Sequence, residues 1–127
     1  MTRVGAANPF ALHEGAAETW GFIERRVLED GLVDRGLKEL CFAYVADPDA
    51  VQVERYSGRE RAALEWAYAI VWDADASTDE LWARLYDEFS EQELVELGCA
   101  IGFELGRTHV LRSLGADPLC VRASQLR

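Results

Sequence analysis

Few side chains in this sequence could do chemistry near neutral pH. The histidines are His13 and His109, and the cysteines are Cys41, Cys99 and Cys120. No C-x-x-C or C-x-x-H pair occurs, so the ligand spacing of a structural zinc site is missing. An odd number of widely spaced cysteines favours free thiols over a disulfide framework. We therefore expect no metal and no cofactor.

The acid–base candidates lie in the last apolar stretch of the chain. His109 stands beside a run of glycines and could act as an acid or base near neutral pH. The simpler interpretation is a half-buried histidine bonded to a backbone carbonyl, since no second member of a catalytic set is evident. Glu104 has the same two interpretations: a buried carboxylic acid, or a boundary residue paired with Arg107 or Thr108.

We expect Cys41 and Cys99 to be unreactive thiols. Cys41 falls on the apolar face of a predicted helix, and Cys99 falls on an apolar side of another, where a thiol usually serves as a small hydrophobic group. Cys120 follows Asp117-Pro118 in the tail, and we expect it to be exposed. Glu39 lies on the polar side of the same helix as Cys41, so periodicity predicts that it is solvated.

Helices must position these residues. Asn8-Pro9 is typical of a helix start, and apolar residues then recur every three or four positions to Val27, which predicts a helix over about residues 9–30 that could break near Gly15. Asp34 is the expected N-cap of a second helix. Asp47-Pro48 ends that helix, because the residue before proline resists the α conformation.

Three further helices are predicted by S-x-x-E capping boxes at Ser57, Ser77 and Ser90, each ahead of an apolar periodic run. No segment shows sustained alternation, so no strand is predicted. The sequence thus predicts one all-α domain over residues 1–127, a bundle of five to six helices. Its core would cover about residues 9–115, followed by a loosely held tail over residues 116–127.

The last predicted helix carries Gly98, Gly102 and Gly106 between two apolar sides. Each glycine costs a helix about 1 kcal/mol relative to alanine, so close packing of another backbone is the expected compensation. That backbone could belong to this chain or to a second subunit. A helix apolar over so wide an arc is expected to be covered on nearly all sides.

Charge and composition exclude several classes of protein. The 23 acidic residues exceed the 13 basic ones, giving a net charge of -10, so a nucleic-acid partner is not expected. No apolar run approaches the roughly 20 residues of a membrane span, and no secretory signal is visible. We therefore expect a cytoplasmic protein. Lys38 is the sole lysine, and this preference for arginine favours a GC-rich bacterial genome.

Four stretches resemble the carboxymuconolactone decarboxylase and alkylhydroperoxidase-D-like proteins: residues 31–40 (GLVDRGLKEL), 56–70 (YSGRERAALEWAYAI), 78–85 (TDELWARL) and 89–97 (FSEQELVEL). The resemblance covers about residues 30–115. It implies an alkylhydroperoxidase-D-like helical fold in a homo-oligomer, which could be a dimer, a trimer or a multiple of three. Redox members of that family carry a C-x-x-C pair about a dozen residues after a glutamate, and Glu39 matches that glutamate.

The cysteine pair of those members would fall near residues 51–54, where this chain has Val-Gln-Val-Glu. The dithiol peroxidase activity is therefore not expected, whereas acid/base chemistry on a small organic acid or lactone stays open, with Glu39, His109 and Cys41 as candidate catalytic residues. The alternative hypothesis is a non-catalytic oligomeric module that binds a small ligand or a protein partner. A cavity shared by Glu39 and His109 would favour the enzyme.

Overall fold

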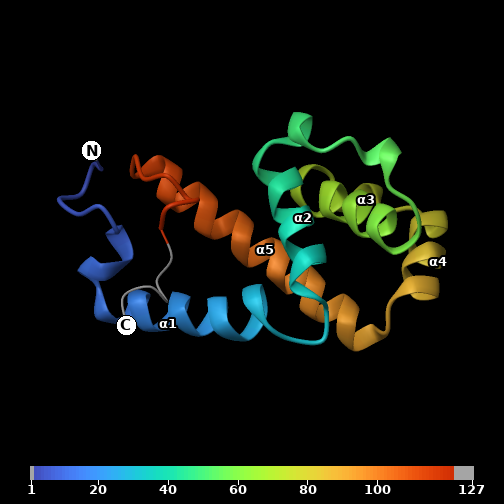
Figure 1. Cartoon of the computed structure of the whole chain (residues 1–127), viewed down its shortest axis with the longest axis horizontal. Helices are drawn as coiled ribbons and strands as arrows, with labels where there is room; N and C mark the ends of the chain where they lie inside the picture. Colours follow the sequence, from blue (N-terminus) through green and yellow to red (C-terminus); the bar gives the residue numbers. More distant parts are fainter. Residues whose placement is uncertain (1, 122–127) are drawn as a thin grey trace.

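The computed structural model describes residues 2–121, apart from the side chain of Ala76. This part of the chain is helical, with no strand. Figure 1 shows the longest helix, α5, running diagonally across the molecule, with α2, α3 and α4 gathered around its first half and α1 beside its second half. The α-helices are α1 (Glu14–Ile23), α2 (Arg35–Ala46), α3 (Gly58–Trp72), α4 (Asp79–Glu88) and α5 (Glu91–Ser113). The all-α class is confirmed; the alkylhydroperoxidase-D-like arrangement stays a prediction.

The first predicted helix is three segments rather than one. Asn8 caps a short 3-10 helix, Pro9–Leu12, with proline in its first turn as expected. His13 then caps α1, because its Nδ1 accepts a hydrogen bond from the backbone N–H of Ala16 at 3.0 Å. The chain continues as a π-helix, Glu24–Glu29. The break therefore lies at His13, where a side chain that can cap starts a new helix.

Of the four later helix starts, three lie where the sequence predicts them, at Asp34, Ser57 and Ser90. Asp34 accepts from the N–H of Leu37, and Ser90 and Glu93 form the full capping box of α5. Ser57 holds the N-cap position of α3, but its side chain makes no capping bond. The box at Ser77 is wrong: Thr78 caps α4, while the Ser77 hydroxyl donates to the carbonyl of Ala74. Two adjacent hydroxyl residues both suit an N-cap, and the sequence did not distinguish them.

The main core lies between α2, α3, α4 and the first half of α5. The predicted apolar faces supply it, including Cys41, which is completely buried. A smaller cluster joins the N-terminal segment to the end of α5, where the Phe10 and Trp20 rings stack 5.4 Å apart beside Leu111, Ala116 and Val121. The main core thus holds α2 beside the first half of α5, and the smaller cluster holds the N-terminal segment against its end.

The single lysine is buried and structural. The Lys38 ammonium donates to the carbonyls of Val27 at 2.6 Å and Asp30 at 3.3 Å, and it lies 3.2 Å from the Glu96 carboxylate. An ammonium has three protons, so these contacts satisfy it. Glu96 in turn accepts from the backbone N–H groups of Leu32 and Val33. The pair therefore fastens the loop before α2 to α5.

Glycine is required where that loop meets Glu96. Gly31 has φ +150°, and a Cβ there would lie 2.0 Å from Oε1 of Glu96. No other residue type fits this approach.

The tail is held more firmly than expected as far as the structure describes it. Ala116 and Val121 are buried, and the carbonyls of Pro118 and Val121 accept hydrogen bonds from Arg107. The prediction of a loose tail is therefore wrong for residues 116–121, because a buried cation holds them. Residues 122–127 lie outside the described part of the chain.

The expectation that α5 is covered on nearly all sides is wrong within one chain. A Cβ built at Gly102 or Gly106 meets nothing within 4 Å, so no backbone of this chain approaches them. At Gly98 the neighbour is a side chain: a Cβ would lie 2.9 Å from the Trp66 ring. The physical reason is that α5 packs against α2, α3 and the π-helix Glu24–Glu29 on its other sides.

Candidate functional site

The structure separates the three residues proposed from sequence. Glu39 lines a cavity between α2 and α5, Cys41 lies in the main core, and His109 is exposed on the open side of α5. Glu39 and His109 therefore do not line a common cavity. The catalytic set of Glu39, His109 and Cys41 is not assembled.

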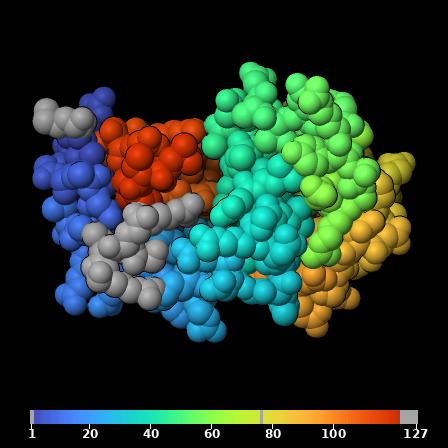
Figure 2. Space-filling model, in the orientation of Figure 1, coloured from blue at the N-terminus to red at the C-terminus, as the bar shows by residue number. Residues whose placement is uncertain are grey.

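The cavity at Glu39 has a volume of about 430 Å³ and is walled by α2, the second half of α5 and the segment after it. In Figure 2 the red end of the chain and the teal α2 flank this region on the face shown. Apolar groups from both sides contribute to the lining. The lining residues are Glu39, Phe42, Ala43, Ala46, Asp47, Glu104, Arg107, Thr108, Arg112, Asp117, Pro118 and Leu119.

A buried ion pair builds the inner wall. The Arg107 Nε donates to Oε1 of Glu104 at 2.5 Å, and both side chains are almost inaccessible to solvent. The same carboxylate oxygen accepts from the Thr108 hydroxyl at 3.4 Å. Pairing of Glu104 with Arg107 and Thr108 was the simpler of the two interpretations from sequence, but the burial of all three was not expected.

Arg107 also holds the outer wall of the cavity in place. Its two terminal nitrogens donate to the Val121 carbonyl at 2.7 Å and the Pro118 carbonyl at 3.0 Å. The guanidinium thus bridges α5 and the tail, which lets Asp117, Pro118 and Leu119 close one side of the cavity. The sequence analysis named Arg107 only as a possible partner of Glu104 and missed this role. Its i,i+3 spacing from Glu104, next to an apolar run, was the available signal.

Glu39 lies at the rim of the cavity rather than inside it. Its carboxylate pairs with Nε of Arg35 at 3.1 Å, and 61% of its side chain is exposed. An ion pair this exposed contributes little to stability. The expectation that Glu39 is solvated is therefore largely met, although the residue also borders the cavity.

Carboxylates outnumber cations around the cavity. Four acidic side chains line it (Glu39, Asp47, Glu104 and Asp117), against the two guanidinium groups of Arg107 and Arg112. The charge of Arg107 is offset by Glu104, and Arg112 donates to the Ala46 carbonyl at 3.3 Å. The electrostatic potential in the cavity therefore disfavours an anionic ligand.

The three cysteines are free thiols in different environments. Burial raises the pKa of Cys41 to about 12, so it stays a protonated thiol near neutral pH. The hydrogen bond to Asp117 raises the pKa of Cys120, which is exposed as expected. Cys99 is exposed on the open side of α5, contrary to its predicted apolar burial, because nothing in the chain covers that side. None of the three is an activated, paired cysteine.

Residues 2–121 contain neither a metal-binding cluster nor a membrane-spanning helix. Within this range no group of three or more His, Cys, Asp or Glu side chains could hold a metal ion. Nor does any helix there combine the length and apolarity that crossing a membrane requires.

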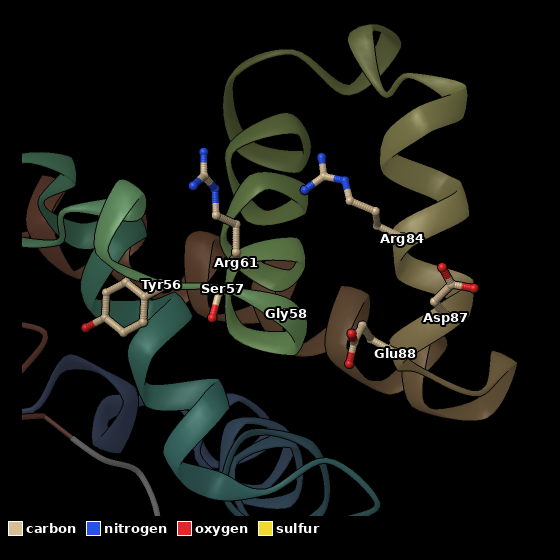
Figure 3. A pocket seen from close by; sticks show the side chains of 7 residues that line it. All are labelled: Tyr56, Ser57, Gly58, Arg61, Arg84, Asp87 and Glu88. Carbon is tan, nitrogen blue, oxygen red and sulfur yellow. The ribbon is translucent and has the colours of Figure 1, made fainter.

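A second hollow, of about 280 Å³, lies where the start of α3 faces α4. Figure 3 shows Arg61 and Arg84 extending in the same direction there, with Asp87 and Glu88 toward the other end. Both guanidinium groups pair with Glu65, and the two carboxylates line the hollow itself. Three carboxylates thus stand against two guanidinium groups, so the arginines are not arranged to bind an anion.

Comparisons with protein-family models, with curated proteins and with solved structures found no match for this chain. The fold class therefore rests on the coordinates, and the resemblance to the carboxymuconolactone decarboxylase-like family stays a prediction from the sequence.

Proposed function

We propose that this protein is a non-catalytic, carboxymuconolactone decarboxylase-like helical module that binds a small organic molecule between α2 and α5. The observation that carries the proposal is the 430 Å³ cavity, whose inner wall is the buried pair of Glu104 and Arg107. This volume is in the range of small-molecule sites. The buried pair gives the site a rigid polar wall, while Phe42 and Leu119 supply apolar contact.

The ligand class follows from charge. Four carboxylates face two guanidinium groups in the lining, and Arg107 already directs hydrogen bonds to Glu104, Pro118 and Val121. We therefore expect a neutral or positively charged organic molecule rather than a carboxylic acid. A dicarboxylate lactone would meet like charge at Glu39 and Asp47 on the rim.

A second candidate is acid/base chemistry on a neutral lactone. One observation favours it: Glu39, the residue matched by the family resemblance, borders the cavity. In that case Glu39→Gln would abolish turnover while leaving binding intact. The exposure of His109 away from the cavity makes binding alone the stronger proposal.

The experiment is a thermal-shift titration with two probes of similar shape and opposite charge, phenethylamine and phenylpropanoate. Saturating the folded state at about ten times Kd stabilises it by about 1.4 kcal/mol. We expect phenethylamine to raise the Tm and phenylpropanoate to leave it unchanged.

Two matched variants test whether phenethylamine binds in this cavity. Ala43 lines the cavity and Ala50 does not, and both are exposed. Ala43→Trp should fill the space and weaken phenethylamine binding at least tenfold, whereas Ala50→Trp should bind like the parent. Equal binding by both variants would show that the ligand site lies elsewhere.

Homo-oligomerisation, expected from the resemblance, remains part of this proposal. Its support is the open side of α5, which carries large exposed apolar side chains.

A further inference from the structure

The open side of α5 is an apolar surface with no partner in the chain. Val95, Phe103 and Val110 are 67%, 37% and 46% exposed. Gly102 and Gly106 lie between them with open space above. From Val95 to Val110 the surface is about 22 Å long.

This surface is also poor in charge. The positions that form it, from Val95 through Cys99 and Gly102 to Gly106 and Val110, contain no acidic or basic residue in a chain of net charge -10. Depletion of charge at an exposed apolar patch is the compositional mark of an interface core. Single exposed apolar residues are ordinary, but a continuous helix face of them is not.

A groove adjoins this surface at the start of α5. It has a volume of about 360 Å³ and is lined by aromatic rings of α3 and α4 together with Glu91 and Gly98. Trp66 and Trp82 meet edge to face at 5.5 Å, and Tyr86 lies beside Trp82 at 5.9 Å. A planar side chain that can also donate a hydrogen bond to the Glu91 carboxylate fits this lining.

The surface and the groove complement each other when α5 is paired with an antiparallel copy of itself. Take a two-fold axis midway between positions 100 and 101. Val95 and Gly106 are then equally distant from the axis, and so are Cys99 and Gly102. Each larger side chain thus meets a glycine of the other copy, which is how an isologous contact works. The same symmetry brings His109 of one copy level with Gln92 of the other, about 1.5 Å along the helix axis from Glu91.

We infer that a second copy of this chain docks antiparallel on α5, with Val95 over the partner's Gly106 and with His109 in the partner's aromatic groove beside Glu91. The glycines let the two helix axes approach to about 8 Å. The imidazole stacks against the rings of the groove and donates to the carboxylate. His109 is thereby an interface residue, and the glycines of α5 serve association.

In this dimer the Cys99 residues of the two copies lie close together. With axes about 8 Å apart and an axial offset of about 4.5 Å, the two Cys99 Cα atoms lie about 6 Å apart. That is within the range that a disulfide spans. Of the other two cysteines, Cys41 is buried, and Cys120 can be removed by Cys120→Ser.

The first experiment is oxidation of the Cys120→Ser protein with diamide. Diamide takes up the two protons and two electrons released when two thiols form one disulfide. We expect a covalent dimer through Cys99, and none from the double variant Cys99→Ser/Cys120→Ser. Absence of a covalent dimer at a protein concentration where sedimentation shows association would overturn the antiparallel register.

The second experiment is sedimentation equilibrium of the full chain over a range reaching about 100 µM, which detects weak association. Gly106→Leu removes a residue of low helix propensity, and a Cβ at this position meets no group of its own chain, so the variant should fold. It should lower the dimer association constant at least 100-fold. His109→Ala should lower it about tenfold. Leu12→Asp, at an exposed apolar residue away from α5, should not change it.

A monomer throughout this range, or an oligomer that Gly106→Leu leaves intact, would overturn the inference. Neither result bears on ligand binding in the α2–α5 cavity, which the Ala43→Trp comparison tests separately.

Discussion

Arg107 and Glu104 form a buried ion pair one turn apart on α5, joined at 2.5 Å between Nε and Oε1. The same guanidinium bonds the carbonyls of Pro118 and Val121. One side chain therefore joins the last helix, the tail and the wall of the cavity. Both the shape of the cavity and the order of residues 116–121 depend on it.

Loss of Arg107 should destabilise the fold strongly. Arg107→Met removes the cation paired with Glu104 and both bonds to the tail, so we expect a loss of about 3–5 kcal/mol in the free energy of unfolding. Urea denaturation measures this. Arg112→Met, at an exposed arginine of the same cavity, is the control and should cost less than about 1 kcal/mol. Similar losses in both variants would contradict the role assigned to Arg107.

The glycines of α5 should respond differently to alanine. Gly102→Ala meets no atom of this chain, so it should stabilise the folded monomer by about 1 kcal/mol through helix propensity. At Gly98 a Cβ would lie 2.9 Å from Trp66, so the same gain should be cancelled by displacement of the indole. Urea unfolding of dilute protein compares them. Equal stabilisation at both sites would contradict the packing of Trp66 over Gly98.

The helical plan could be predicted from the sequence because local signals decide it. Asp34 and Ser90 cap helices as their spacing indicates, and Asp47 before Pro48 ends α2. Cys41 is buried as its place on an apolar face predicts. These features depend on neighbours within four residues, which the sequence displays directly.

The site could not be predicted because it depends on contacts distant in sequence. Arg107 is buried only because carbonyls 11 and 14 residues further on fold back over it. Lys38 is likewise buried by backbone carbonyls before α2 and by Glu96 on α5. The open side of α5 was not predicted, for the opposite reason. Apolar periodicity shows which side chains a helix could bury, but it does not show whether another part of this chain covers them.

Acid should weaken the fold through Glu96. Burial raises the pKa of Glu96, but hydrogen bonds from Val33 and Leu32 and the pairing with Lys38 outweigh burial and hold it below its usual value. A lowered folded-state pKa gives stability that is present above the unfolded value and is lost as pH falls through the folded one. Glu96→Gln should therefore lose most stability near neutral pH.

A pH series of urea unfolding tests this. The difference between the parent and Glu96→Gln should shrink as pH falls below about 4.5, the ordinary range of a glutamate. A difference that stays constant down to acid unfolding would show that Glu96 stabilises through packing rather than charge.

Cysteine labelling should distinguish the three thiols. Cys41 is buried with a pKa of about 12, so in the folded protein it should not react with a thiol reagent near neutral pH. In protein dilute enough to be monomeric, Cys99 and Cys120 are exposed and should react. Mass spectrometry should find two modified cysteines in folded protein and three after unfolding. Rapid modification of Cys41 would contradict its burial and restore a role for it in thiol chemistry.

The central claim is that the space between α2 and α5 binds a small ligand. An amide-resolved NMR titration with phenethylamine tests it most directly. The account predicts saturable shift changes centred on Phe42, Ala43 and Thr108, which line the cavity, with Arg61 and Arg84 of the second hollow unchanged. Saturable changes centred on the second hollow, or no saturable change at any residue, would contradict it.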